Sequence, residues 1–96
     1  MLRFEWNEEK NRSNLRKHGI GFATATRVFE DPSCVMEQDR EIDGEERWQT
    51  IGRMDDVMVV MVAHTVADDE KGVIFRIISA RRATAHERRR YEANTD

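Results

Sequence analysis

The stretch VMVVMVAHTV, residues 57–66, decides the fold. It is rich in β-branched residues and apolar at both odd and even positions, which is typical of a strand covered on both faces at the centre of a sheet. A second apolar segment, VIFRIISAR at residues 73–81, follows after the turn ADDEKG. Upstream, residues 34–36 and 47–51 indicate two strands joined by a turn at Asp43-Gly44. The sequence therefore predicts four consecutive strands connected by short turns.

Helices are predicted before and after these strands. Asn7 is a good N-cap for a helix over residues 8–18, which Gly19 ends, and a second helix over residues 22–30 ends before Pro32. A capping box from Thr84 to Glu87 begins a helix that runs to about residue 93. With a short strand at residues 4–6, the order is β-α-α-β-β-β-β-α. We predict an α+β fold in which the sheet is an antiparallel meander and the helices pack to one side.

Length and composition predict one domain, residues 1–96, without metal or cofactor. The chain has 96 residues, 39% hydrophobic and 36% charged, a balance typical of a globular protein. Its longest apolar run, residues 57–63, is too short to span a membrane, so we expect a cytoplasmic protein with no membrane partner. The lone Cys34 and three scattered histidines provide neither a disulfide nor a metal cluster. The sequence has neither the Gly-rich loop typical of nucleotide hydrolysis nor the G-x-S-x-G motif typical of acyl transfer.

Charge is distributed unevenly along the chain. The formal net charge is −3, but residues 81–91 carry five arginines and one glutamate, whereas residues 30–46 carry eight acids and one arginine. Such asymmetry can build a basic face on an acidic protein, or the two segments can pair with each other. The last helix has little apolar surface, so we expect it to be mobile or to contact a partner.

Polar residues inside the apolar strands are the candidates for chemistry. Arg76 interrupts an apolar face, His64 ends the central strand, and Arg53, Ser79 and Arg81 can gather with them along one side of the sheet. Cations and a proton-transferring histidine suit phosphodiester cleavage, for which RNA supplies its own 2′-hydroxyl nucleophile. The alternative for each residue alone is structural: a core histidine, an arginine paired with an acid, or a serine at a strand end.

The sequence also resembles the BrnT toxins of bacterial type II toxin–antitoxin systems. The matching segments are FEWN with Lys10, NLRKHGIGFATA (residues 14–25), VFEDP (28–32), EER (45–47), IGR (51–53), VAHT (62–65), RIISAR (76–81), Ala83-Thr84, Glu87-Arg88 and Tyr91. They follow the family in order over nearly the whole chain. The chain differs from the family at Asn7, Gly21, Arg82 and the turn ADDEKG, where Asp, Ser and Lys are common at the first three.

The resemblance implies a RelE-like ribonuclease fold and toxicity through RNA cleavage that inhibits translation. It also implies neutralisation by a BrnA-like antitoxin, a ribbon-helix-helix protein that binds operator DNA and forms a hetero-oligomer with the toxin. The residues it places in catalysis are His64, Arg53, Arg76, Ser79 and Arg81, and we predict substrate contacts from Lys17, His18, Arg82, Arg88 and Tyr91. The alternative function is a non-catalytic co-repressor component that acts only by binding with its antitoxin.

Overall fold

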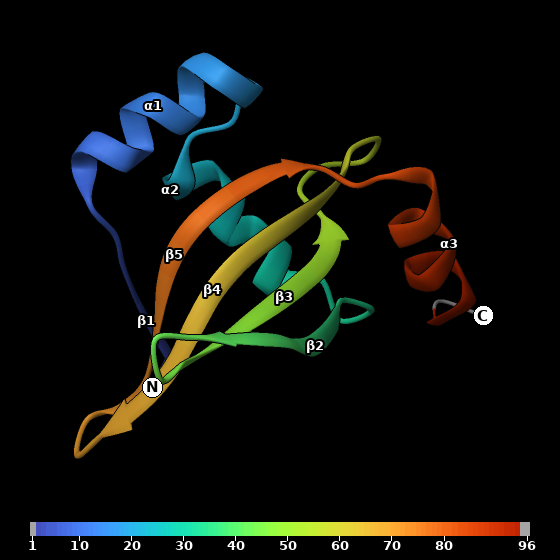
Figure 1. Cartoon of the computed structure of the whole chain (residues 1–96). Coiled ribbons are helices and arrows are strands. Elements are labelled where there is room, and N and C mark those ends of the chain that lie inside the picture. Colours follow the sequence, from blue (N-terminus) through green and yellow to red (C-terminus); the bar gives the residue numbers. More distant parts are fainter. Residues whose placement is uncertain (1, 95–96) are drawn as a thin grey trace.

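Five strands form one sheet in the order β1-β5-β4-β3-β2 in the computed structural model, which describes residues 2–94 (Figure 1). The strands are β1 (Leu2–Glu5), β2 (Val35–Ile42), β3 (Glu45–Arg53), β4 (Val59–Asp69) and β5 (Gly72–Arg82). The helical elements are α1 (Glu8–His18), α2 (Phe22–Ala25), the 3-10 helix η1 (Thr26–Glu30) and α3 (Ala85–Asn94). This order confirms the prediction, except that the helix expected over residues 22–30 is divided into α2 and η1.

The central position of β4 is confirmed. It pairs antiparallel with β3 on one side and β5 on the other, and Val60, Met61 and Val62 are all buried. The turn between β2 and β3 is also as predicted, since Asp43 and Gly44 both have positive φ angles, 51° and 80°, as a tight hairpin turn requires. Strands β2 to β5 therefore form the expected antiparallel meander.

The first strand corrects the prediction of a wholly antiparallel sheet. β1 pairs in parallel with β5, from Leu2 opposite Val73 to Glu5 opposite Arg76. Turn signals specify pairing between neighbouring strands, but this pair joins opposite ends of the chain, so its direction depends on tertiary packing. The Phe4 ring on β1 lies 6.1 Å from the Phe75 ring on β5, which anchors the strand at this edge.

Helices cover both faces of the sheet, so the prediction of helices on one side is wrong for α3. α1, α2 and η1 lie over one face, where Phe22 and Val28 pack in the same core as Val62. On β4, Met61 is adjacent to Val62 and points to the opposite face. Tyr91 of α3 packs in the same cluster as Met61, because only two residues separate β5 from α3 and the helix folds onto the nearer face.

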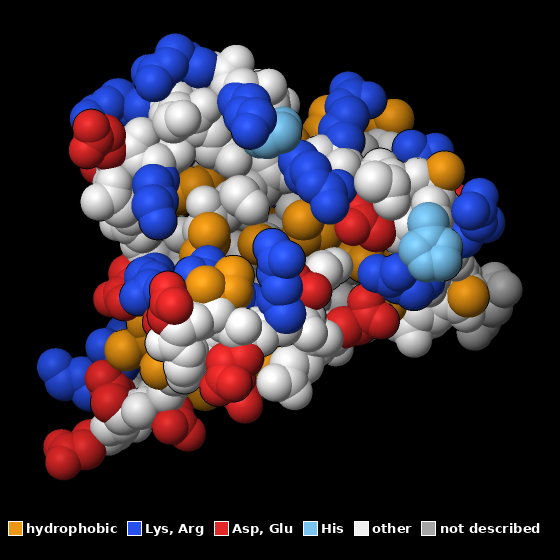
Figure 2. Space-filling model, in the orientation of Figure 1, with side chains coloured by type: hydrophobic (Ala, Val, Ile, Leu, Met, Phe, Trp, Pro, Cys, Tyr) orange, Lys and Arg blue, Asp and Glu red, His pale blue; other side chains and the backbone are white. Residues whose placement is uncertain are grey.

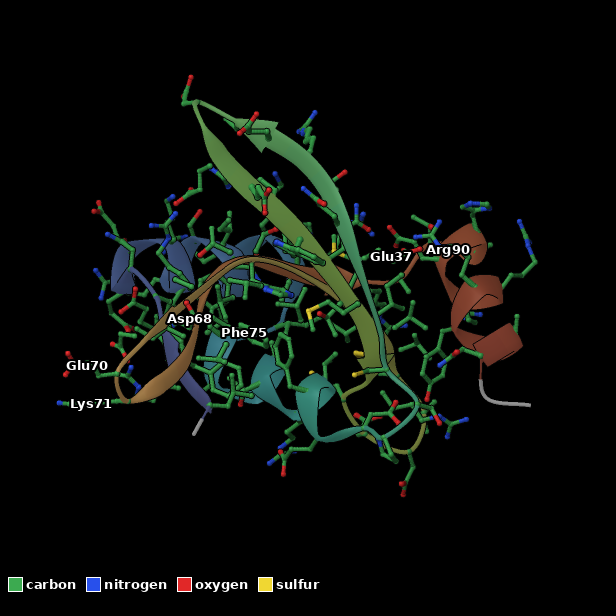
Figure 3. All side chains as sticks on the ribbon, turned by 90° about the horizontal axis from the view of Figure 1, so that it is seen from below. Glu37, Asp68, Glu70, Lys71, Phe75 and Arg90 are labelled. Carbon is green, nitrogen blue, oxygen red and sulfur yellow. The ribbon has the colours of Figure 1, made fainter. Side chains whose placement is uncertain are left out.

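The rest of the second face carries polar and charged side chains and is called here the open face. Its members across β2 to β5 are Glu37, Glu45, Arg47, Gln49, Ala63, Arg76, Ser79 and Arg81. Figure 2 shows cationic side chains gathered over α1 at the upper left, and acidic ones toward the hairpin tips at the lower left. The tip of the β4–β5 hairpin, with Asp68, Glu70 and Lys71, projects from the body of the protein (Figure 3).

Candidate active site

A β-bulge in β5 determines which predicted residues share a face. Ala63 of β4 lies opposite Ser79, but the next residue, His64, lies opposite Ile77, so Ile78 is an extra residue in β5. An inserted residue reverses the alternation of side chains beyond it. As a result, both arginines of the RIISAR motif lie on the open face together with Ser79. In a regular strand, Arg76 would lie on the opposite face from Ser79 and Arg81.

Arg76 pairs with an acid, which is the structural alternative for an arginine in an apolar strand. Its Nη2 atom lies 2.6 Å from Glu45 Oε1, and Arg47 Nη2 lies 3.6 Å from the same oxygen. The Arg76 side chain is 44% exposed. One carboxylate therefore holds two guanidinium groups side by side on the open face, and of the two Arg76 is the more exposed.

Arg81 is held in a fixed orientation by α3. Its two terminal nitrogens donate to the two carboxylate oxygens of Glu87 at 2.8 and 3.1 Å. Thr84 and Glu87 exchange backbone and side-chain hydrogen bonds, which confirms the predicted capping box. Burial alone raises the pKa of Glu87, but hydrogen bonds from Arg81 and Thr84 outweigh burial and lower it. The bidentate contact directs the Arg81 guanidinium toward α3, two residues along β5 from Ser79.

A groove between α1 and β5 joins residues that the sequence places far apart. It has a volume of about 190 Å³, and the residues that line it are Lys10, Ser13, Asn14, Lys17, His18, Ile78 and Ser79. The buried Asn14 side chain fixes α1 to the edge of β5, since it donates to Ala80 O at 2.8 Å and accepts from Ala80 N at 3.1 Å. This contact sets the last turn of α1, with Lys17 and His18, alongside Ser79.

His64 lies on the covered face and is separated from this groove. Its side chain is fully buried beside the rings of Phe29 and Phe75, at centroid distances of 5.1 and 4.7 Å. Nδ1 donates to Thr65 O at 3.1 Å, so in the neutral ring Nε2 accepts from the Thr50 hydroxyl at 2.7 Å. Burial lowers the pKa of His64. This geometry corresponds to the alternative of a core histidine and corrects the expected gathering of His64 with the arginines.

The comparisons with known proteins agree with this fold. Residues 6–87 match the family described as the ribonuclease toxin, BrnT, of type II toxin-antitoxin systems. The chain belongs to the BrnT family. The crystal structure of the Brucella abortus ribonuclease toxin BrnT superposes with a TM-score of 0.64 and 22% identity, covering 88% of this chain and 99% of that chain. At this identity the likeness shows a shared fold. A comparison with curated protein sequences gave no match.

Two further residues of the BrnT motifs, Arg53 and Tyr91, support α3 and lie away from the groove. The Tyr91 hydroxyl donates to Asp31 Oδ2 at 2.6 Å, and Tyr91 is 2% exposed. Arg53 donates from its backbone N–H to the same oxygen and from Nη1 to Asp56 O. Val59 lies opposite Arg53 and Thr65 lies opposite Arg76, and these two residues of β4 are six positions apart, about 20 Å at the rise of a strand. Arg53 therefore does not gather with Arg76.

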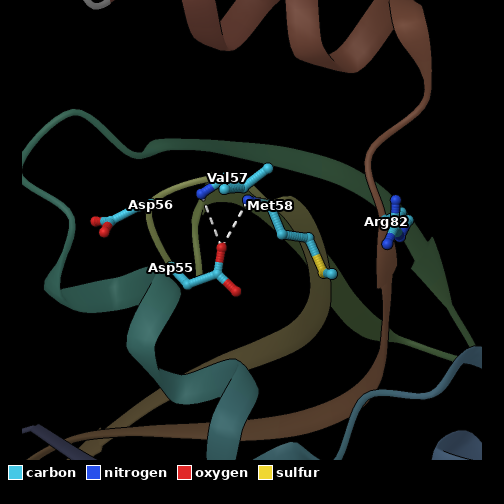
Figure 4. A pocket seen from close by; sticks show the side chains of 5 residues that line it. All are labelled: Asp55, Asp56, Val57, Met58 and Arg82. Carbon is cyan, nitrogen blue, oxygen red and sulfur yellow. Dashed lines mark hydrogen bonds between the residues drawn. The ribbon is translucent and has the colours of Figure 1, made fainter.

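The other two residues predicted to contact substrate, Arg82 and Arg88, also lie apart from Ser79. Arg82 pairs with Val60 and points to the covered face. It lines a separate pocket of about 340 Å³ with Asp55, Asp56, Val57 and Met58 (Figure 4). There the Asp55 carboxylate accepts hydrogen bonds from the amides of Val57 and Met58. Arg88 is exposed on α3.

Sequence reasoning gave no site role to three residues that line the groove or share the open face, although Lys10 and Arg47 were among the family matches. Arg47 and Gln49 lie on the open face, and Lys10 lines the groove itself. The alternation of Arg47, Gln49 and Ile51 with Trp48 and Thr50 in the predicted strand is the signal that places the first three on one face. Lys10 gives no such signal, because only the packing of α1 brings it to β5.

Two features are absent from residues 2–94, the part of the chain that the structure describes. No three His, Cys, Asp or Glu side chains are arranged to hold a metal ion. No helix in that part of the chain is long and apolar enough to cross a membrane.

Proposed function

We propose that this BrnT-family toxin cleaves RNA in the groove between α1 and β5 without a metal ion. The observation that carries the proposal is the meeting of Lys17 and His18 with Ser79 in one groove. Lys17 and His18 are adjacent in α1 and far from Ser79 in the sequence, and packing of α1 on β5 brings them together. A lysine, an imidazole and a hydroxyl are groups that bind a phosphodiester and transfer protons during its cleavage.

The proposed reaction uses the 2′-hydroxyl of the RNA as nucleophile. The 2′-hydroxyl gives up its proton to a base in the groove as its oxygen bonds to the adjacent phosphorus. The bond from phosphorus to the 5′-oxygen breaks, that oxygen takes up a proton, and the products are a 2′,3′-cyclic phosphate and a 5′-hydroxyl. Lys17 and the neighbouring Arg81 stabilise the negative charge of the transition state. His18 replaces His64 as the proton-transferring group, because His18 is exposed and lines the groove.

Membership of the family supports the proposed biological setting. RNA cleavage by the free toxin inhibits translation and growth in the cytoplasm. A BrnA-like antitoxin with a ribbon-helix-helix DNA-binding fold neutralises the toxin by forming a hetero-oligomer with it, and the pair contacts operator DNA only through the antitoxin. The RelE-like classification of the fold belongs to the same proposal.

Incubation of the purified chain with RNA in EDTA tests the proposal. We expect cleavage that yields 2′,3′-cyclic phosphate and 5′-hydroxyl ends, that antitoxin prevents, and that fails when the 2′-hydroxyl at the cleaved position is replaced by hydrogen. Cleavage that requires added metal contradicts the mechanism. Absence of cleavage at any metal concentration, with antitoxin-dependent DNA binding retained, supports the non-catalytic co-repressor.

Matched variants locate the site. Lys17→Ala and His18→Gln should lower the cleavage rate at least tenfold, whereas Lys71→Ala, which removes an exposed lysine at the β4–β5 tip, should leave it unchanged. Arg76→Ala and Arg81→Ala should abolish growth arrest while the protein remains folded. Full growth arrest by a folded Arg76→Ala protein contradicts its role in binding phosphate.

A further inference from the structure

We propose that Gln49 reads a nucleobase of RNA bound across the open face, and so sets the sequence preference of cleavage. This inference rests on the proposed ribonuclease function and adds a binding site for the nucleotide beside the scissile phosphate. The ligand class is single-stranded RNA, whose unpaired bases are free to present their hydrogen-bonding edges to a protein.

Gln49 belongs to a row of side chains that crosses the sheet and ends at the groove. Glu37 of β2 lies opposite Gln49 of β3, Gln49 lies opposite Ala63 of β4, and Ala63 lies opposite Ser79 of β5. Directly opposed residues share a face, so all four side chains point to the open face. Gln49 and Ser79 are two strand spacings apart, about 10 Å, a span that one nucleotide covers from its phosphate to its base edge.

The side chain between Gln49 and Ser79 in this row is small. Ala63 is the smallest side chain of the four, and it is only partly buried, so it is the lowest point of the row between Gln49 and Ser79. A phosphate bound by Ser79 and Lys17 in the groove then places its own base over Ala63 and against Gln49.

Unsatisfied polar atoms gather at the Gln49 end of the row. Gln49 Oε1, Arg47 Nε and Arg90 Nε are each buried without a hydrogen-bond partner among the described residues. A buried acceptor without a partner is unfavourable, and a ligand N–H that reaches it restores the missing bond. An amide offers an acceptor and two donors, which is the combination that distinguishes one base edge from another.

Charge around the row favours RNA as the occupant. Arg47 and Arg76 lie on one side of it and share the single carboxylate of Glu45, which leaves a net positive charge there. Arg81, paired with Glu87, lies on the other side. The single acid in the row, Glu37, is neutralised by Arg90 at 2.9 Å (Figure 3). Both side chains of this pair are at least a third exposed, so the pair is free to move aside when a base approaches Gln49.

Binding of non-cleavable RNA tests the inference. Four short 2′-O-methyl RNAs, each with a different base over the central positions, are titrated against wild type, Gln49→Leu and the control Gln38→Leu. Gln38 is an exposed glutamine of β2 that pairs with Trp48, on the covered side of the sheet. We expect the ratio of the largest to the smallest dissociation constant among the four RNAs to fall roughly tenfold in Gln49→Leu, the effect of one lost hydrogen bond to a buried group. The same ratio should stay unchanged in Gln38→Leu.

The outcomes separate this inference from the proposed function. RNA binding and cleavage by wild type with the same base ratio in a folded Gln49→Leu protein overturn the role of Gln49 alone. Failure of wild type to bind any of the four RNAs overturns the proposed function as well. Gln49→Glu provides a second variant, since it keeps the acceptors and loses the donors, and it should change the order of preference among the four bases. An unchanged order contradicts the inference.

Discussion

Replacement of Glu87 tests whether α3 is held to the sheet by its polar contacts. The Glu87 carboxylate accepts two hydrogen bonds from Arg81 and one from the Thr84 amide. Hydrogen bonds to charged groups contribute about 1.5–3 kcal/mol and a capping residue about 1 kcal/mol. The Arg81 side chain is 34% exposed, so water recovers part of this loss. We therefore expect Glu87→Ala to lower the free energy of unfolding by about 2–3 kcal/mol.

Urea unfolding followed by tryptophan fluorescence measures this loss. In a domain of this size the same change corresponds to a fall in the melting temperature of roughly 10–20 °C. Because contacts lower the pKa of Glu87, its stabilising effect is present above the unfolded value of about 4.3 and is lost as the pH falls through the folded value. The difference between wild type and Glu87→Gln should therefore shrink in acid. Glu70→Gln, at the exposed β4–β5 tip, is the control. A Glu87→Ala protein as stable as wild type contradicts the anchoring of α3 through Arg81.

Three further predictions concern the rest of the fold. Burial lowers the pKa of His64, so the free energy of unfolding should fall as the pH drops below the unfolded pKa of about 6.5. His64→Gln should remove this pH dependence. A free energy of unfolding that stays constant for wild type from pH 5 to 8, measured with urea, contradicts the prediction. Gly52→Ala should cost about 1–3 kcal/mol in the same assay, because its Cβ would lie 2.9 Å from Cys34 Cβ, whereas Gly21→Ala, with 3.8 Å to its nearest atom, should cost less. Amide hydrogens of α3 should exchange faster than those of β4 and gain protection when antitoxin binds; equal, antitoxin-independent protection would show that α3 belongs to the stable core.

The sequence predicted the elements well because their signals are local. Asn7 accepts from the Lys10 amide as an N-cap, and Gly19 adopts the left-handed conformation that ends α1. The helix over residues 22–30 was predicted from apolar spacing alone, and that spacing does not distinguish an α-helix from a 3-10 helix. Binding of the Phe22 amide to the Asn11 side chain, a tertiary contact, fixes where this segment begins.

The candidate site was only partly predictable, because its residues depend on register. The sequence predicted RIISAR and the Lys17-His18 pair as candidate site residues, but the assignment of Arg76, Ser79 and Arg81 to one face required the extra residue at Ile78. The same registers place His64 on the covered face. A period-two pattern has no means of showing a bulge, since each apolar isoleucine of the motif suits either face.

The sequence by itself determined the central strand, the hairpins, the helix caps and the family, because each depends on residues close in the chain or on motifs matched one by one. Only the tertiary structure decided the parallel pairing of β1, the position of α3 on the face of the sheet opposite α1, and the groove that unites α1 with Ser79. These features join segments far apart in the chain. Their free energy comes from contacts such as that of Asn14 with Ala80, which exist only after the whole sheet has formed.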